Sequence, residues 1–430
     1  MAFTHWLECL SLLPDPKSKF SFTHPSSMTL LSGVISPMFT RLFPSRPSLI
    51  KFVAALSVVA IASCDVPVPS SGSNGPKIDT SEPVPVALLV PYDSAQSSDV
   101  ALAQSIENAA RLAMADLQGV TIDLKVYPTG GSAERASAAA SQAVASGAKI
   151  ILGPVYGGSA KLAGIPAANA GVNVLSFSNN PDVAGGNVFI LGPTFANTAN
   201  RLVRYAVKNG KKNILVVNGE NPAETAGAAA VVAAIGSNGA TLSGQTSFEM
   251  SQTGVTQAIP EIAASSRSAG AEAIFFTSGN DGAMPLLAQM LPENGITSPS
   301  TQYIGLQRWN IPPTAMTLPG LQNSWFAIPD AALTQTFAGR YSAAYGQQPH
   351  ALAGLAYDGI AAIGALVKSG DANALTTQAL TRSSGFAGVN GVFRLLPNGT
   401  NERGLSIATI QNNQVVEIDP APRAFGGFGL

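Results

Sequence analysis

Apolar runs of strand length alternate with alanine-rich segments of helical period along most of the chain. The segment 98–117 spaces Ile106 and Ala113 for one helix face, and it lies between the apolar runs 85–91 and 120–127. Near-continuous apolar strands separated by helices are typical of a parallel sheet that helices cover on both faces. The pattern therefore predicts the α/β class. Further strands are expected at 149–154, 172–178, 187–193, 212–218, 241–249, 271–277 and 301–306.

The alternation completes one cycle by residue 193 and then starts again, which predicts two Rossmann-like lobes. Further helical segments follow the second cycle, near 331–345 and 350–369. Because one lobe does not need so many elements, the chain is expected to cross between the lobes several times. Ligands in open α/β sheets bind beyond the carboxyl ends of the strands, which predicts a central interlobe cleft. The predicted division gives 85–193 and 330–388 to the first lobe, 194–329 and 389–419 to the second, and 420–430 to a tail.

Residues 1–63 have the pattern of a signal peptide region rather than of a fold. The run FVAALSVVAIAS at 52–63 is too short to span a bilayer, which takes roughly 20 apolar residues, and it follows several basic residues. Its end resembles the bacterial lipobox, in which a cysteine, here Cys64, becomes lipidated; a plain signal peptide is the alternative. Met38 is an alternative start with a compact basic leader. The Pro/Ser/Gly-rich residues 64–84 are expected to form a lipoprotein linker.

Composition excludes several classes of function. Charged residues make up 11% of the chain, the formal net charge is −1, and there is no Lys/Arg-rich run, so there is no electrostatic footprint for nucleic acid. The cysteines are Cys9 and Cys64, and His350 is the one histidine after the leader, which leaves no disulfide framework or metal site in the body. Without G-x-S-x-G or carboxylates paired at a telling spacing, neither an enzyme nor a cofactor is predicted.

The loop GPVYGGSAK at 153–161 stands between an apolar strand and a helix. It has neither the Gly-Lys-Ser/Thr of a P-loop nor G-x-G-x-x-G, so it does not predict a nucleotide site. The helix is expected to begin near Ser159, after a turn without side-chain bulk at Gly157 and Gly158, and its free N–H groups suit a carboxylate. The alternative is that Ser159 serves only as an N-cap, worth about 1 kcal/mol.

The segment GPVYGGSAKLAGIPAANAGVNVLSFSNNP resembles the corresponding part of type I periplasmic binding proteins of the Leu/Ile/Val-binding kind. In that family a Gly-Pro loop, a helix, a Gly-Val strand entry and a Ser-rich loop ending in Asn-Pro follow in this order. The resemblance covers Val84 to about Asp419. It implies two lobes, joined by crossovers near residues 193, 329 and 389, that close on a small ligand. Similar segments are IENAARLAMADL, LAYDGIAAIGAL and FAGVNGVFRLLPNGT.

The resemblance and the loops at strand ends together give the candidate ligand contacts. The family's usual hydroxyl residue after the Gly-Pro loop falls at Gly157 or Gly158, and its second-lobe Tyr-Gly is replaced by Ala226-Gly227. An acidic residue for the ligand's amino group is implied at Asp281, which alternatively caps the helix that follows. Turn residues also serve backbone geometry alone. The candidates are Tyr92, Asp93, Tyr156, Gly157, Gly158, Ser159, Ser176, Ser178 and Asn179 in the first lobe, and Asp281 and Trp309 in the second.

Two functions fit these features. The first is a periplasmic, membrane-anchored lipoprotein that captures an amino acid or similar small polar ligand by lobe closure and delivers it to an ABC importer permease. The second resembles the penicillin-binding protein activators, lipoproteins that regulate cell-wall synthesis by contact with a peptidoglycan synthase. The first function is the prediction, and the second is the alternative, which the missing hydroxyl and tyrosine favour.

Overall fold

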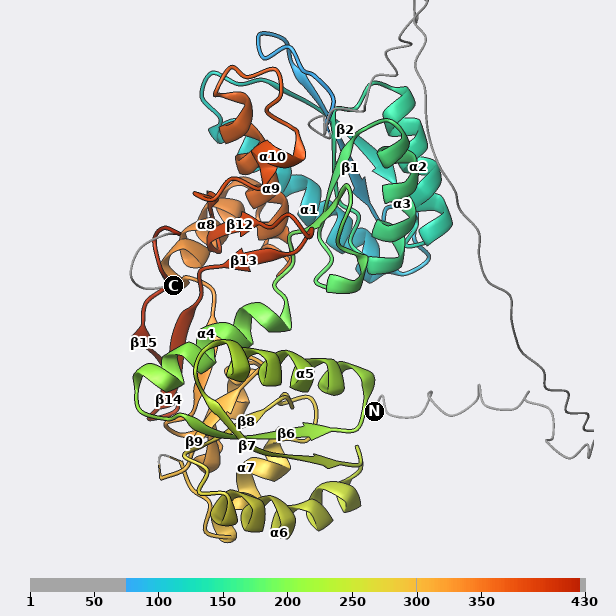
Figure 1. Ribbon diagram of the computed structural model, residues 1–430. Helices are drawn as coiled ribbons and strands as arrows, with labels where there is room; N and C mark the ends of the chain where they lie inside the picture. Colours follow the sequence, from blue (N-terminus) through green and yellow to red (C-terminus); the bar gives the residue numbers. More distant parts are fainter. Residues whose placement is uncertain (1–74, 299, 426–430) are drawn as a thin grey trace, which may run out of the picture. The chain divides into compact units, whose positions relative to one another are not determined.

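The computed structural model describes residues 75–298 and 300–425, which build two lobes on separate sheets (Figure 1). The first sheet runs, in spatial order, through β2 (Ile122–Pro128), β1 (Val84–Val90), β3 (Ile150–Leu152), β4 (Asn173–Ser176) and β5 (Val188–Ile190). All its strand pairs are parallel. Strands are added on opposite sides of β1, so the carboxyl ends of β1 and β3 flank the crevice where ligands of such sheets bind.

Helices cover both faces of this sheet, and Figure 1 shows α2 and α3 on one side of β1. Along β1, Leu88 packs into the core of one face and Leu89 into that of the other, and both are fully buried. This two-sided burial explains why the strand is a continuous apolar run. One face carries α1 (Ser97–Asp116), α8 (Ala331–Tyr345), α9 (Ala353–Val367) and α10 (Thr377–Leu380), and the other carries α2 (Ala133–Ala145) and α3 (Gly157–Asn169).

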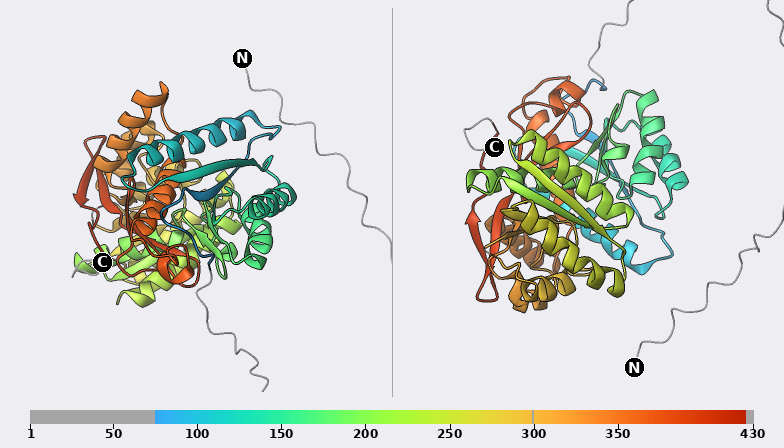
Figure 2. Two further views of the ribbon diagram at one scale, coloured as in Figure 1. Left: turned by 90° about the horizontal axis from the view of Figure 1, so that it is seen from above. Right: turned by 60° about the horizontal axis from the view of Figure 1, so that its bottom comes forward.

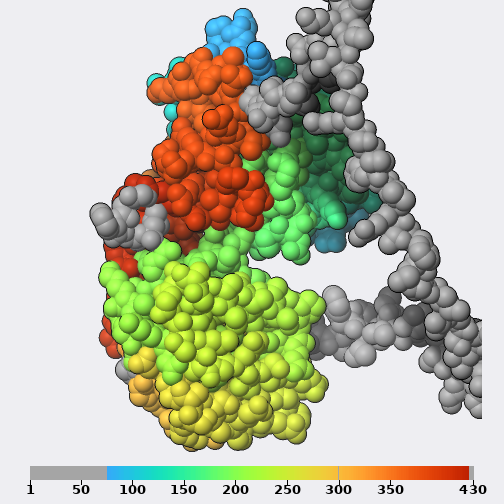
Figure 3. Space-filling model, in the orientation of Figure 1, coloured from blue at the N-terminus to red at the C-terminus, as the bar shows by residue number. Residues whose placement is uncertain are grey.

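The second sheet has the order β15 (Gln414–Asp419), β14 (Ser406–Gln411), β10 (Trp325–Ile328), β9 (Gln302–Gly305), β8 (Ala273–Phe276), β6 (Asn213–Gly219) and β7 (Thr241–Phe248). Strands β6 to β10 are parallel, and β14 and β15 join antiparallel. One face is covered by α4 (Phe195–Lys208) and α5 (Pro222–Ser237), the other by α6 (Gln252–Ser268) and α7 (Met284–Glu293) (Figure 2). The segment that contains these helices, green to yellow in Figure 3, forms this lobe's surface on the face shown. The predicted α/β class with two lobes is confirmed.

A small antiparallel sheet precedes the last passage of the chain into the second lobe. It consists of β11 (Phe386–Gly388), β12 (Gly391–Leu395) and β13 (Asn401–Arg403). Phe393 and Leu395 pack in the first core, whereas Leu405 packs in the second. The crossover expected near residue 389 therefore falls between Leu395 and Leu405, because β12 pairs with β11 and carries its apolar residues back to the first lobe. Short 3-10 turns lie at Pro181–Val183, Pro313–Thr317 and Pro319–Leu321.

The first lobe begins earlier than the predicted boundary at residue 85. Ile78 is buried in the first core, and its N–H donates to the carbonyl oxygen of Ala372 at 2.9 Å. The end of the predicted linker 64–84 is thus part of the fold, because an apolar residue in a polar stretch finds a place in the core. The start of that linker, the signal segment and Cys64 lie outside the described residues. No helix in the described ranges is long and apolar enough to cross a membrane.

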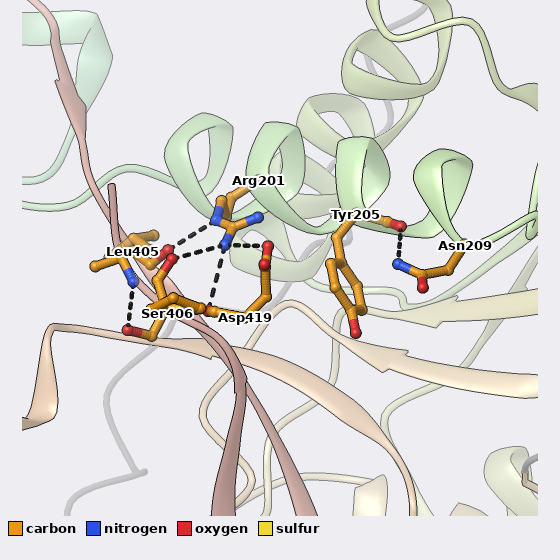
Figure 4. A network of polar contacts seen from close by, with 8 residues as sticks. Arg201, Tyr205, Asn209, Leu405, Ser406 and Asp419 are labelled. Carbon is orange, nitrogen blue, oxygen red and sulfur yellow. Dashed lines mark hydrogen bonds and ion pairs between the residues drawn. The ribbon is translucent and has the colours of Figure 1, made fainter. Parts of the chain in front are cut away.

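Side chains fix the crossover segments to one another. The Asn401 amide donates to the carbonyl oxygen of Ile190 at 2.8 Å. Arg201 on α4 donates from Nε to the carbonyl oxygen of Leu405 at 2.7 Å and forms a 2.7 Å ion pair with Asp419 (Figure 4). Segments far apart in the sequence are thereby joined beside the second sheet.

Candidate ligand-binding site

The loops after β3 and β4 are tied together at the carboxyl edge of the first sheet. Gly153 has a φ of 91°, and a Cβ there would lie 2.2 Å from the carbonyl oxygen of Leu89, so only glycine fits this close crossing. Ser176 is fully buried, donates to the carbonyl oxygen of Pro154 at 2.8 Å and accepts from the N–H of Ser178 at 3.1 Å. The Ser176 hydroxyl is therefore used to hold loop backbone.

Helix α3 begins with backbone amides that no side chain in the described residues caps. Tyr156 is the N-cap, the helix starts at Gly157, and Ser159 is buried inside the first turn. The alternative that Ser159 is the N-cap is therefore wrong, because the helix begins two residues earlier than expected. Apart from its chain neighbours and the backbone of α3, no atom of the described residues lies within 4 Å of where a Cβ of Gly158 would be, so this side of the helix start has room for a ligand. It presents unpaired N–H donors and the positive end of the helix dipole.

Tyr156 and Asp99 join the starts of two helices at this edge. The Tyr156 hydroxyl donates to Oδ1 of Asp99 at 2.5 Å, and the Ser94 hydroxyl donates to Oδ2 at 2.8 Å. Desolvation, together with the hydrogen bond to Asp99 and its charge, raises the pKa of Tyr156 to about 12. The phenol therefore stays protonated at neutral pH, and 40% of the residue is exposed.

The two candidates in the loop after β1 already have partners. The Tyr92 hydroxyl donates to Glu107 at 2.9 Å, and its side chain packs against the first core. Burial, and after it the hydrogen bond to the charged Glu107, raises the pKa of Tyr92 above its usual value. Asp93, in a left-handed conformation with φ 61°, pairs with Arg135 at 3.3 Å on the surface. Both contacts stay within the first lobe.

A cavity of about 930 Å³ is lined by the loop after β4, by α4 and α5, and by the segment from β12 to β13. The first lobe contributes Asn179 and Asn180, and α5 contributes Pro222 and Ala226. Among the sequence candidates, Asn179 lines this cavity, whereas the start of α3 at Gly157 and Gly158 lies outside its lining. The Ser178 hydroxyl accepts from the Asn180 N–H at 3.1 Å. The volume suits a small molecule, and the small side chains of α5 leave its wall open.

Glu224 is a feature of the second lobe that sequence reasoning missed. Its Oε2 accepts from the N–H of Gly219 at 2.6 Å and from the hydroxyls of Thr277 at 2.9 Å and Ser278 at 2.7 Å. Its Oε1 has no hydrogen-bond partner among the described residues. The sequence signal is Asn221 followed three residues later by glutamate, a helix-start pattern that points to capping. The carboxylate instead turns to the carboxyl ends of β6 and β8.

The two second-lobe candidates lie in different surroundings. Asp281 is exposed in the turn between β8 and α7, and it does not cap a helix at Gly282 because α7 begins at Met284. Trp309 is fully buried, and its Nε1 donates to the carbonyl oxygen of Ser278 at 3.1 Å. The indole is part of the second core in this structure and orders the loop that holds Ser278.

Two Rossmann-like lobes, repeated crossovers and a ligand-sized cavity lined from both lobes define the class of type I solute-binding proteins. Residues 83–414 match the family model described as periplasmic binding protein, and the chain belongs to this family. Membership confirms the sequence resemblance and implies a solute-binding role outside the cytoplasm.

Solved structures show the same fold at low identity. A branched-chain amino acid ABC transporter protein from Rhodospirillum rubrum is 17% identical with a TM-score of 0.67, covering 78% of this chain and 100% of its own. A branched-chain amino acid ABC transporter ligand-binding protein from Burkholderia xenovorans is 16% identical with a TM-score of 0.59, covering 80% and 97%. An ABC transporter substrate-binding protein from Desulfitobacterium hafniense in complex with Leu is 18% identical with a TM-score of 0.57, covering 78% and 100%. No curated protein matches the sequence.

Proposed function

We propose that this protein captures an amino acid or a similar small zwitterion and delivers it to an ABC importer. The observation that carries the proposal is the opposite polarity of the two lobes. The first lobe offers hydrogen-bond donors at the start of α3, and the second offers the free acceptor of Glu224. A carboxylate and an ammonium on one small ligand match these two edges.

On the first lobe, the amides of Gly157 and Gly158 bind the ligand's carboxylate. Backbone N–H groups at a helix start, with roughly half a positive charge from the helix dipole, suit an anion without any side-chain hydroxyl. The hydroxyl of Ser178 and the side-chain amide of Asn180, in the loop after β4, lie within 3.5 Å of where a Cβ of Gly157 would be and supply further donors beside this helix start. Asn179, the neighbouring sequence candidate, lines the cavity.

On the second lobe, Oε1 of Glu224 accepts from the ligand's ammonium group. The three donors that hold Oε2 fix the carboxylate and keep the other oxygen available. Asp281, in the loop after β8, adds a second acidic group near this edge. Because the ligand's two charges are bound by different lobes, binding stabilises the closed arrangement.

The structural neighbours support the ligand class and the transport role, since they are described as branched-chain amino acid ABC transporter components or carry bound Leu.

For the location, we propose lipidation of Cys64 after removal of the preceding signal segment. A Cys64→Ser variant then moves from the membrane fraction to the soluble extracytoplasmic fraction.

The test is isothermal titration calorimetry of the protein with the twenty common amino acids. The Glu224→Gln variant is expected to lose at least about tenfold in affinity, because a hydrogen bond to an ammonium loses its charged acceptor. Glu220→Gln is the matched control, since Glu220 lies in the loop directly before α5, four residues from Glu224, and its Oε1 accepts from Ser247 on the surface. If no amino acid binds or raises the melting temperature at millimolar concentration, the proposal fails. Co-purification with a peptidoglycan synthase would then favour the regulator.

A further inference from the structure

Asp99 is a carboxylate enclosed at the ligand edge of the first lobe without a cationic partner. Only 8% of the residue is exposed, and its oxygens accept from two neutral hydroxyls, those of Tyr156 and Ser94. Asp99 takes part in none of the ion pairs of the described residues. The guanidinium of Arg135 is paired with a different carboxylate, that of Asp93, at 3.3 Å. Asp99 lies in the first turn of α1, where the positive end of the helix dipole offsets part of the cost of enclosing its charge, and a bound cation offsets more of it.

The Tyr156 hydroxyl holds one oxygen of this carboxylate, which therefore lies at the edge of the ring, and 40% of the tyrosine residue is exposed. Its hydroxyl is fixed at 2.5 Å from Asp99, and a Cβ added to Gly131 would lie 3.8 Å from the ring. The ring therefore spans the loops after β1, β2 and β3 in a set orientation. The face of a tyrosine attracts cations, and a negative charge hydrogen-bonded to its hydroxyl adds to this attraction.

We propose that the bound amino acid carries a basic side chain, whose cation lies on the face of the Tyr156 ring, near the Asp99 carboxylate at the hydroxyl end of that ring. The proposal rests on the proposed function, because it takes the carboxylate at Gly157 and Gly158 as the ligand's anchor. These glycines directly follow Tyr156, so a side chain that leaves the anchored Cα toward α1 passes along the tyrosine. An aliphatic ligand leaves Asp99 unpaired and removes more water from it when the lobes close. Asp99 acts here as a positioning residue, and Tyr156 makes the contact.

The experiment compares L-lysine and L-arginine with the uncharged L-norleucine and L-glutamine by calorimetry on the full chain. The basic ligands are expected to bind at least about tenfold more tightly. The Asp99→Asn variant keeps an acceptor for the Tyr156 hydroxyl but removes the charge, so most of this preference is lost. Tyr156→Phe keeps part of the preference through its ring, and Tyr156→Leu abolishes it.

Asp116→Asn is the matched control, because Asp116 is also an acidic residue of α1 that accepts from a tyrosine, Tyr357, but it stands at the far end of the helix. Its ligand preference is expected to equal that of the unmodified chain. Melting without ligand shows whether each variant folds. Tighter binding of norleucine than of lysine, or an unchanged preference in Asp99→Asn, overturns the inference and leaves the proposed function standing. Absence of binding by every amino acid overturns both.

Discussion

Gly153 shows how one residue fixes the geometry of the candidate site. It lets the loop after β3 pass against β1, and this crossing places the start of α3 at the edge of the sheet. A side chain at this position meets the carbonyl oxygen of Leu89 and a left-handed φ at once. The conformation of the loop that carries Tyr156 therefore requires a residue without a Cβ at position 153.

The Gly153→Ala variant is expected to lower the free energy of unfolding by about 2 kcal/mol or more, from backbone strain and the clash with Leu89. Gly158→Ala is the control, because it has open space around its Cβ position and no left-handed φ, and its change should stay within about 0.5 kcal/mol. Urea denaturation measures both. Equal effects at the two positions would contradict the role given to Gly153.

At the scale of single side chains, the sequence located the loops but not the direction of their residues. Tyr156 and Asn179 were predicted in loops at the carboxyl ends of strands, and these loops do follow β3 and β4, with Asn179 lining the cavity. Glu224 was missed because its orientation depends on Thr277, 53 positions away in the sequence. Trp309 looked like a loop residue in sequence, yet it is fully buried because the loop folds back onto the second core. Such contacts are set by packing between elements, which local spacing does not encode.

At the scale of elements, hydrophobic period was a good guide. The helix expected over 98–117 runs from Ser97 to Asp116, because its apolar spacing has a single solution on one helix face. The last crossover was misplaced because β12 alternates too briefly to show which lobe it faces. Only its pairing with β11 decides that.

A buried ion pair attaches β13 to α9 beside that crossover. Arg403 is only 4% exposed and Asp358 is fully buried, and they pair at 3.2 Å, while Arg403 Nε donates to the carbonyl oxygen of Leu191 at 2.9 Å. Oδ1 of Asp358 also accepts from the N–H of Val389 at 2.7 Å. Burial raises the pKa of Asp358, and the Arg403 charge opposes that shift. The pair therefore holds two passages of the chain against the first lobe.

Arg403→Met is expected to cost about 3–5 kcal/mol at neutral pH, because it leaves Asp358 buried without a counter-charge. In the variant the folded-state pKa of Asp358 lies further above its unfolded value, so the folded form binds a proton that the unfolded form releases. Stability then falls as the pH rises through the interval between these pKa values, and the loss is smaller at pH 5 than at pH 8. Chemical denaturation at both pH values measures this.

The exposed pair Lys125–Asp123, at 3.5 Å, provides the control. Lys125→Met should change the free energy of unfolding by about 0.5 kcal/mol or less, with no comparable dependence on pH. A similar loss in both variants would show that burial of the Arg403 pair is not the cause.

At the scale of the whole molecule, residues ahead of β1 complete the first lobe. A Cβ at Gly75 would lie 2.6 Å from the Cα of Thr376, so the chain is packed against the segment before α10 from that point. Ile78 is buried in the same core and is hydrogen-bonded to Ala372. The sequence placed all of 64–84 in a linker because proline, serine and glycine dominate it, and one isoleucine gives no period from which burial can be inferred.

A chain that begins at Gly75 should therefore unfold at the same denaturant concentration as a longer one, whereas a chain that begins at Pro83 should lose about 2 kcal/mol or more. Ile78→Ala in the chain from Gly75 separates the contribution of the Ile78 side chain from that of the backbone contacts. This variant is expected to lose most of the free energy of unfolding that the chain from Pro83 loses. Ligand affinity should be unchanged in all three, because Ile78 packs in the core formed by α1 and α9, remote from the amides of α3. If the chain from Pro83 is as stable as the longer ones, residues 75–82 contribute nothing to the first lobe, and the fold begins at β1.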